Sequence, residues 1–374
     1  MVMNTVIYRN NLLIISKKRG RQMKKIVLFF TVFSLVFLFT SCDLTTLLGE
    51  EQDLGNLEGT IKDAVTNDPI SGVEITLHSS HHTETKSSDS NGKYSFSEAP
   101  IGSYSISFQK TGYLEADGTV EIKKDETEIY PQILYLSTSY SGDGTYQGRV
   151  QDALNGTGID NVTLKLREGL NNTTGTIINT YNTDSSGNFS FIKSYGYYTL
   201  ELIKTDYTTT SYNITVVGNN TTTQDLTMTP VLEEGKTRII LTWGENPEDL
   251  DSHLVKVKDG TVEYHVYYSA KISSEAELDH DDTSSYGPET ITITNLDSDA
   301  DYYYYILDYT NHGDTTTSDA LANSSAKIEL YYNGNYTVYN VPSGEATIWK
   351  VFKISSGTVI RQDIMTYDEP YPTN

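Results

Sequence analysis

Short runs in which apolar and polar residues alternate make up most of the chain from about residue 57 onward. In such a run every second side chain points to the same face, which suits a strand with one buried and one solvated side. Gly, Asn, Asp and Ser, the residues that favour turns, separate the runs. After residue 45 we find no segment with the apolar spacing of an amphipathic helix. The pattern predicts an all-β protein built from tandem β-sandwiches.

One set of runs occurs twice, about ninety residues apart. The first copy comprises residues 59–64, 72–77, 89–96 and 102–106, and the second comprises residues 148–153, 161–166, 184–191 and 196–200. Both copies contain Asp-x-x-Gly followed by two alternating aromatic residues, which are Tyr94 and Phe96 in the first copy and Phe189 and Phe191 in the second. We expect the Asp to cap a tight turn, the Gly to adopt the positive φ of that turn, and both aromatic rings to face the core.

The order of these elements resembles the carboxypeptidase regulatory-like domain, a transthyretin-like Greek-key sandwich. The first copy, assigned to residues 57–138, matches this pattern down to Gly112-Tyr113. The second copy, assigned to residues 145–231, is divergent, because residues 204–207 depart from the Lys-x-Gly-Tyr of the first. The resemblance implies that both modules serve as spacers or binding platforms without catalytic activity.

An uncharged, mostly apolar run occupies residues 26–39 and follows a cluster of basic residues between positions 17 and 25. A membrane-spanning helix needs roughly 18 or more apolar residues, so this run has the length of a signal-peptide core instead. It ends at Thr40-Ser41-Cys42, and Cys42 is the only cysteine of the chain. This ending resembles the lipobox of bacterial lipoproteins, although Phe39 stands where an aliphatic residue is more usual. The resemblance implies lipidation of Cys42, and an ordinary secretory signal is the alternative.

These features predict how the N-terminal part is organised. We expect residues 1–41 to be a leader and signal peptide, with Met23 as a hypothetical true start, and residues 42–56 to be an acidic tether. The mature protein would be exported and attached to a membrane by its N-terminal lipid, either facing the periplasm or at the cell surface.

The composition changes after Pro230, and residues 235–366 are predicted to form a third domain ahead of a tail at residues 367–374. This domain contains Leu-Thr-Trp-Gly at residues 241–244, Asp-Leu-Asp-x-His-Leu at residues 249–254 and Tyr-Gly-Pro-Glu at residues 286–289. These motifs resemble the YfaP-type domain of exported bacterial proteins, and the resemblance implies a β-sandwich but no particular activity.

Two acidic stretches of this third domain form a candidate metal site. Its predicted ligands are Asp249, Asp251, Asp279, Asp281 and Asp282. In each stretch two carboxylates are two residues apart, so both point to one face of an extended segment. If the two strand ends adjoin, the carboxylates converge, and hard oxygen ligands at that density favour Ca²⁺ over zinc or copper. The alternatives are that the aspartates cap turns, or that His253 and His280 make the site suited to a transition metal.

Tyrosine is unusually common, with 29 residues against 10 phenylalanines. The run at residues 302–305 consists of four tyrosines, and as a strand it places two rings on each face. One pair is predicted to lie in the core. The other pair either lies at the surface, where amphipathic rings suit carbohydrate binding, or packs beneath loops.

The net charge and the absence of common catalytic motifs argue against several classes of function. The formal net charge is −23, which disfavours nucleic acid as a partner. The chain contains no Gly-x-Ser-x-Gly, His-Glu-x-x-His or phosphate-binding glycine loop. We therefore interpret the protein as a non-enzymatic, lipid-anchored envelope protein whose stalk presents a C-terminal domain to an unknown envelope protein or glycan, with Ca²⁺ as a candidate cofactor and otherwise none. The alternatives are a structural adaptor without a small ligand, and a carbohydrate-active enzyme whose carboxylates lie between residues 249 and 282.

Overall fold

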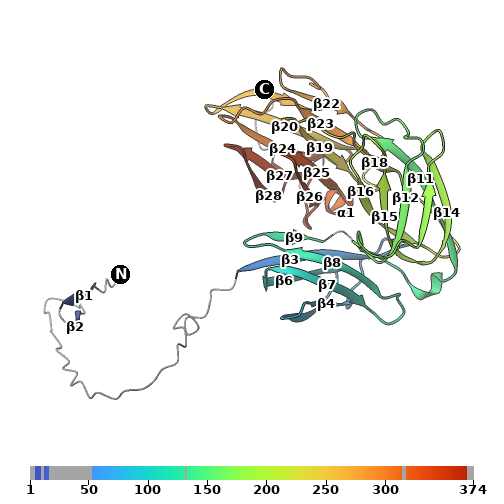
Figure 1. The fold of residues 1–374 in the computed structure, drawn as a ribbon, viewed down its shortest axis with the longest axis horizontal. Coiled ribbons are helices and arrows are strands. Elements are labelled where there is room, and N and C mark those ends of the chain that lie inside the picture. The colour runs from blue at the N-terminus through green and yellow to red at the C-terminus, as the bar shows by residue number, and fades with distance from the viewer. Residues whose placement is uncertain (1–4, 10–11, 17–52, 131–132, 314–316, 369–374) are drawn as a thin grey trace, which may run out of the picture. The chain divides into compact units, whose positions relative to one another are not determined.

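The computed structural model describes residues 5–9, 12–16, 53–130, 133–313 and 317–368. The prediction of an all-β protein with several sheets is confirmed (Figure 1). Within the described part of the chain, the helical segments are a 3-10 turn, η2 (Thr138–Tyr140), and one short helix, α1 (Ala320–Asn323). Two compact units are present, Met1–Gln52 and Asp53–Asn374.

The described residues of the N-terminal unit form an antiparallel pair of strands, β1 (Thr5–Arg9) and β2 (Leu12–Ser16). The expected signal peptide, Cys42 and most of the expected tether lie outside the described residues. In the described ranges there is no helix of the length and hydropathy required to cross a membrane.

The first sandwich consists of two four-stranded sheets. Its strands are β3 (Leu54–Asp63), β4 (Glu74–His78), β5 (Thr83–Ser87), β6 (Lys93–Pro100), β7 (Gly102–Gln109), β8 (Ala116–Ile122), β9 (Thr127–Ile129) and β10 (Ile133–Tyr135). One sheet has the order β10-β3-β6 with β9 also paired to β3, and the other has the order β5-β4-β7-β8. Strand β3 starts at Leu54, three residues before the expected boundary, because Leu54 and Gly55 already pair with the end of β6.

The second sandwich has the same strand order as the first. Its strands are β11 (Asp143–Asp152), β12 (Thr163–Glu168), β13 (Asn179–Asn182), β14 (Asn188–Ser194), β15 (Gly196–Ile203), β16 (Thr210–Val216), β17 (Thr221–Thr223) and β18 (Leu226–Met228). The sheet β14-β11-β17, with β18 also paired to β11, corresponds to β6-β3-β9 with β10, and β13-β12-β15-β16 corresponds to β5-β4-β7-β8. Strand β11 begins two residues before the expected boundary at residue 145.

The repeated turn has the predicted chemistry in both sandwiches. Asp89 accepts hydrogen bonds from the backbone N–H groups of Asn91 and Lys93, and Asp184 accepts the equivalent bonds from residues 186 and 188. Gly92 and Gly187 have φ values of 72° and 83°. The aromatic residues that follow are buried in the two cores, as expected. The sequence therefore determined this local structure twice.

Consecutive sandwiches share buried contacts. The Tyr197 hydroxyl of the second sandwich accepts a hydrogen bond of 2.6 Å from the backbone N–H of Leu136, and its ring belongs to the core cluster of the first sandwich. Gln151 donates a hydrogen bond of 2.6 Å to the backbone oxygen of Gly287 in the third domain, and both groups are buried. Each contact is a hydrogen bond between buried polar groups of two consecutive domains, so the domains pack against each other at these junctions.

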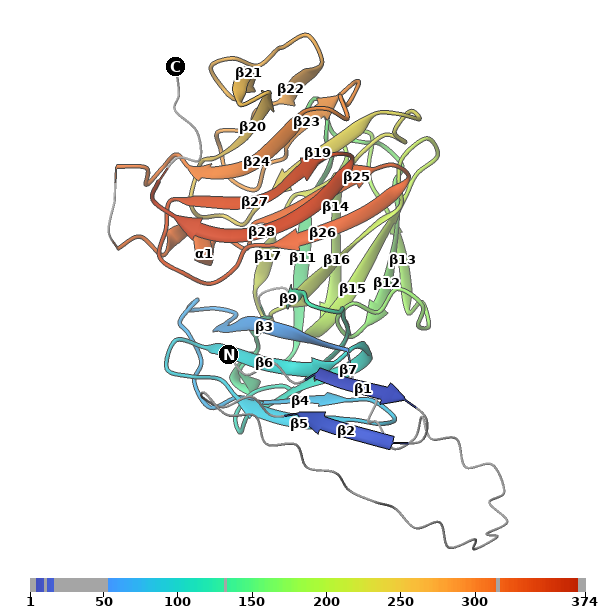
Figure 2. The same ribbon diagram turned by 90° about the vertical axis from the view of Figure 1, so that its left-hand side faces the viewer.

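The C-terminal domain is a sandwich of two five-stranded sheets. Its strands are β19 (Thr237–Thr242), β20 (Leu250–Lys258), β21 (Thr261–Val266), β22 (Ala276–His280), β23 (Glu289–Ile293), β24 (Asp301–Asp308), β25 (Lys327–Tyr332), β26 (Asn335–Asn340), β27 (Ile348–Ser355) and β28 (Thr358–Thr366). The orders are β22-β23-β19-β25-β26 and β21-β20-β24-β27-β28, and Figure 2 shows β24, β27 and β28 running side by side. The core between the sheets contains both tryptophans of the chain, Trp243 and Trp349.

The four tyrosines of β24 divide between two buried environments. Tyr302 and Tyr304 lie in the main core, as predicted for one pair. On the opposite face, Tyr305 is also buried and packs with Val255 and Ile348, while Tyr303 is half-buried. This outward-facing pair is therefore not a free surface for sugars, which agrees with the alternative that it packs against neighbouring segments.

Candidate metal centre

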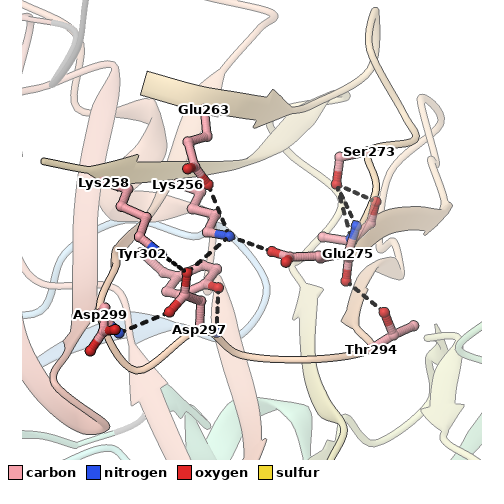
Figure 3. A network of polar contacts seen from close by, with 10 residues as sticks. Lys256, Lys258, Glu263, Ser273, Glu275, Thr294, Asp297, Asp299 and Tyr302 are labelled. Atoms are coloured by element: carbon pink, nitrogen blue, oxygen red, sulfur yellow. Dashed lines mark hydrogen bonds and ion pairs between the residues drawn. The ribbon is translucent and has the colours of Figure 1, made fainter. Parts of the chain in front are cut away.

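Buried charged side chains lie at both ends of strand β20, but only those at the C-terminal end have partners of opposite charge. At the C-terminal end, the Lys256 ammonium group lies 2.5 Å from Glu275, 3.0 Å from Glu263 and 3.7 Å from Asp297 (Figure 3). Burial by itself would lower the pKa of Lys256, but its hydrogen bonds to Glu275 and Glu263 raise the pKa above the ordinary value. Neighbouring Lys258 pairs with Asp297 at 2.6 Å and lowers the pKa of that carboxyl group. At this end every buried charge has a counter-charge.

At the N-terminal end of β20, three carboxylates lie together. Asp249 precedes the strand, Asp251 is its second residue, and Glu289 is the first residue of β23 in the facing sheet. One oxygen from each of the three lies within 4.8 Å of the others. The backbone positions Glu289, because its Oε2 accepts a 2.5 Å hydrogen bond from the N–H of Ser252. We call these three residues the carboxylate cluster.

The carboxylate cluster is buried and incompletely bonded. Asp251 is 2% exposed, Glu289 is fully buried and Asp249 is half-buried. Asp249 Oδ1, Asp251 Oδ2 and Glu289 Oε1 have no hydrogen-bond partner among the described residues. Leaving a buried carboxylate oxygen without a donor or a cation is costly, and folded proteins rarely do so.

The pKa values of all three carboxyl groups are raised, because the groups are buried and lie close to other carboxylates. Burial and the neighbouring charges of Asp281 and Asp282 raise the pKa of Asp249 to about 6. Burial and the charges of Asp249 and Asp281 raise the pKa of Asp251 to about 8. Burial, followed by the charge of Asp251, raises the pKa of Glu289 well above its usual range. Without a cation the cluster therefore holds protons at neutral pH, and a divalent cation would replace them.

The structure brings together part of the predicted ligand set. Asp249 and Asp251 converge, as the spacing predicted. Asp281 lies near them and influences their pKa values, but one of its oxygens is engaged by Lys271 at 2.5 Å. Asp282 accepts hydrogen bonds from the N–H and hydroxyl of Ser284, so it caps a turn, which is the alternative weighed from the sequence.

Asp279 is the predicted ligand that lies apart from the cluster. Strand β22 has a register shift between Leu278 and His280, so Asp279 sits in a bulge and the two-residue alternation toward Asp281 is broken. Burial raises the pKa of Asp279, while Thr292 and the guanidinium of Arg238 oppose the effect. Asp279 therefore interacts with Arg238 and is not a member of the carboxylate cluster.

Sequence reasoning did not select Glu289. A glutamate that directly follows Gly-Pro reads as the polar end of a turn, whereas the fold buries it completely at the start of β23. The two histidines are not among the three clustered ligand residues. His253 instead stacks on Tyr305 with 4.6 Å between ring centroids, and its Nδ1 lies 2.9 Å from His265 Nε2.

The geometry of the cluster suits a cation better than glycoside hydrolysis. Paired carboxylates of glycosidases are separated by roughly 5 to 9.5 Å, so that a sugar or a water fits between them. Here Asp251 and Glu289 have almost no exposure, so a sugar would not fit between the carboxyl groups. An all-oxygen set of this kind is the ligand chemistry of Ca²⁺.

Comparison with known proteins identifies one of the modules. The family model of the carboxypeptidase regulatory-like domain matches residues 56–132. For the second sandwich and the C-terminal domain, the family assignments made from the sequence stay predictions.

Several staphylococcal proteins are similar to part of the chain. Serine-aspartate repeat-containing protein E of Staphylococcus aureus strain USA300 is 27% identical over 274 residues, which is 66% of this chain and 21% of that protein. Serine-aspartate repeat-containing protein F of Staphylococcus epidermidis is 31% identical over 196 residues, covering 44% of this chain and 11% of that protein. The bone sialoprotein-binding protein of Staphylococcus aureus strain MRSA252 is 26% identical over 269 residues, covering 66% and 22%. The chain thus spans about a fifth or less of the length of these relatives.

Solved structures match the chain only weakly. The Bacillus anthracis TIE protein matches 90% of this chain and 56% of its own with 12% identity and a TM-score of 0.22. The minor pilin GBS52 of Streptococcus agalactiae matches 48% of this chain and 97% of its own with 15% identity and a TM-score of 0.22. Of the three modules, the first is the one whose family is established: residues 56–132 form a carboxypeptidase regulatory-like domain.

Proposed function

We propose that this protein is a lipid-anchored, non-enzymatic component of the cell envelope, in which two β-sandwiches carry a C-terminal domain that binds Ca²⁺ and a partner. Cys42 is the proposed attachment point of the lipid. The partner is an envelope protein or a glycan, and the strongly acidic chain disfavours nucleic acid.

The observation that carries this proposal is the carboxylate cluster. Each of the three residues places one carboxylate oxygen within 4.8 Å of the others, and each has a buried oxygen without a hydrogen-bond partner among the described residues. By contrast, Lys256, at the other end of the same strand, is matched by three carboxylates. The same domain therefore compensates buried charge at one end of β20 and lacks a counter-charge at the other. A bound divalent cation would supply the counter-charge in place of the protons that the cluster holds without it.

Asp249, Asp251 and Glu289 would hold the cation, with Asp281 as a further carboxylate close by. Ca²⁺ accepts six to eight oxygen ligands in flexible geometry, and this suits an irregular set drawn from two strands and a loop. The bound ion would neutralise the cluster and fix the loop before β20 against the start of β23.

The staphylococcal relatives support a role in binding a partner. Their names describe a binding protein for bone sialoprotein and serine-aspartate repeat proteins, and each matches this chain over only part of its length. From the first of these names we extend to this chain the role of binding a partner. The closed geometry of the carboxylate cluster disfavours the alternative of a carbohydrate-active enzyme in this region.

Thermal unfolding tests the cation site. Because Trp243 and Trp349 are the only tryptophans of the chain, their fluorescence reports on the C-terminal domain alone. Ca²⁺ at roughly one hundred times its dissociation constant should stabilise this domain by about 3 kcal/mol, and Tm should rise by several degrees over an EDTA control.

Asp251→Asn should abolish the Ca²⁺-dependent rise, while Asp282→Asn, which alters a turn cap near the site, should keep most of it. A wild-type Tm that is the same in Ca²⁺ and EDTA would rule out the site.

Fractionation of cells tests the anchor. The full-length protein should sediment with membranes, and Cys42→Ser should move it to the soluble exported fraction. If Cys42→Ser leaves the membrane association unchanged, the lipid is not the anchor, and the result leaves the Ca²⁺ test unaffected.

A further inference from the structure

A fourth carboxylate, Asp281, lies near the carboxylate cluster and is paired with a lysine. Asp281 directly follows β22, and its Oδ2 is 2.5 Å from the Nζ of Lys271, which lies on the segment between β21 and β22. Besides burial, the charge of Asp281 raises the pKa of each of the three cluster carboxyl groups. Asp281 is therefore close to the whole cluster, although it is not one of the three residues whose oxygens converge.

Only one oxygen of Asp281 is engaged by the lysine. The Asp281 side chain is 14% exposed, and its Oδ1 is buried without a hydrogen-bond partner among the described residues. This oxygen, like those of the cluster, needs a donor or a cation. Ca²⁺ takes six to eight oxygens, so three carboxylates that give one oxygen each leave room for a fourth protein ligand.

Lys271 is placed so that its ammonium group can leave Asp281. Its side chain is 48% exposed, and a half-exposed ion pair contributes little net free energy, so transfer of the ammonium group to water costs little. The backbone stays in place, because the oxygen of Lys271 accepts a 2.7 Å hydrogen bond from the N–H of Leu278 in β22. Lys256 differs, because its side chain is 4% exposed and its departure would leave its partner carboxylates without a counter-charge.

We propose that Asp281 is the fourth protein ligand of the cation and that Lys271 is the counter-ion which the cation displaces, an inference that rests on the proposed Ca²⁺ function. Without Ca²⁺, Lys271 neutralises Asp281 and holds it apart from the three converging oxygens. When Ca²⁺ binds, Asp281 turns toward the doubly charged ion and the ammonium group of Lys271 is released to solvent. Lys271 thereby competes with Ca²⁺ and sets the concentration at which the site fills.

The reactivity of lysine side chains tests the exchange directly. The full chain is treated briefly with an acetylating reagent in Ca²⁺ and in EDTA, and the acetylation of each lysine is measured by mass spectrometry of peptides. An ammonium group held at 2.5 Å by a carboxylate reacts slowly, so acetylation of Lys271 should become several-fold faster in Ca²⁺. Lys258 is the matched control, because it forms a similar pair of 2.6 Å with Asp297 at the other end of β20, and its reactivity should not change.

Calorimetric titration with Ca²⁺ measures the competition. Lys271→Met keeps the apolar stem and removes the charge, so the Kd for Ca²⁺ should fall roughly fivefold. Asp281→Asn should raise the Kd roughly tenfold, because a charged ligand is lost. Lys258→Met removes a paired lysine away from the site and should leave the Kd unchanged.

The outcomes separate the exchange from the cation site itself, because Ca²⁺ binding is measured independently by the rise in Tm. A Ca²⁺-dependent rise in Tm with equal acetylation of Lys271 in Ca²⁺ and EDTA would overturn the exchange and leave the cation site standing. A Kd that is the same in Asp281→Asn and the wild type would show that Asp281 is not a ligand, which also overturns the exchange. Absence of any Ca²⁺ effect on Tm would overturn the proposed function and this inference with it.

Discussion

Replacing Asp251 by asparagine should have opposite effects on stability with and without Ca²⁺. Asp251 is 2% exposed, and its pKa is raised from 3.8 to about 8 by burial and by the charges of Asp249 and Asp281. In the unfolded chain the same carboxyl group ionises near pH 4. Between about pH 4 and pH 8 the native state therefore binds a proton that the unfolded state has released, so the stability falls as the pH rises through this range.

The size of the effect follows from the pKa. Each pKa unit corresponds to about 1.4 kcal/mol, so ionised Asp251 destabilises the cation-free native state by about 6 kcal/mol above pH 8. Asparagine has nearly the same shape and no charge. Because the variant relieves repulsion in the cluster but leaves Glu289 and Asp249 in place, we expect a net gain of about 2 to 4 kcal/mol at pH 8.5 in EDTA. At pH 5.5 the native state keeps Asp251 protonated while the unfolded state has released the proton, so the penalty is only about 2 kcal/mol and the gain should be correspondingly smaller.

Urea unfolding followed by tryptophan fluorescence measures both effects in the C-terminal domain. In EDTA at pH 8.5 the midpoint of Asp251→Asn should lie above that of the wild type, and in saturating Ca²⁺ the order should reverse because the variant has lost a ligand. Equal midpoints at pH 8.5 in EDTA would show that Asp251 is not under electrostatic strain, and the reasoning from the unpartnered oxygens would fail.

Three further substitutions test other parts of the structure. Lys256→Met removes the counter-charge of Glu275, Glu263 and Asp297, and should destabilise the C-terminal domain by about 3 kcal/mol in urea unfolding; a change near zero would mean that these carboxylates are adequately solvated without it. Tyr197→Phe leaves the buried N–H of Leu136 without its acceptor and should lower the free energy of unfolding at the first junction by about 1 to 3 kcal/mol, measured by calorimetry, unless a water replaces the hydroxyl. Gly187→Ala places a Cβ at a φ of 83° and 2.6 Å from the backbone oxygen of Val150, so it should lower the Tm of the second sandwich by several degrees, whereas Gly313→Ala, in open space, should not.

Local features of the protein were predictable because they depend on neighbouring residues. The alternation of apolar and polar positions specified strands, and the Asp-x-x-Gly turns at residues 89–92 and 184–187 specified where two of them begin. The two-residue spacing of Asp249 and Asp251 was enough to place both side chains together. The predicted pair of core rings in β24 followed from the same period of two.

Features that depend on distant residues were beyond the sequence. A single-residue bulge in β22 directed Asp279 toward Arg238. The alternation of apolar and polar residues in this segment does not predict a bulge. Glu289 joined the carboxylate cluster because β23 faces the start of β20 across the sandwich, a contact between residues 37 positions apart in the chain.

The sequence by itself determined an all-β chain, its repeated turn chemistry and an acidic C-terminal domain, since these follow from side-chain period and turn preference over a few residues. Only the tertiary structure decided which carboxylates lack a counter-charge and which tyrosines are exposed. Burial and charge pairing are properties of the packed sheets, and they are fixed by which strands face one another rather than by spacing along the chain.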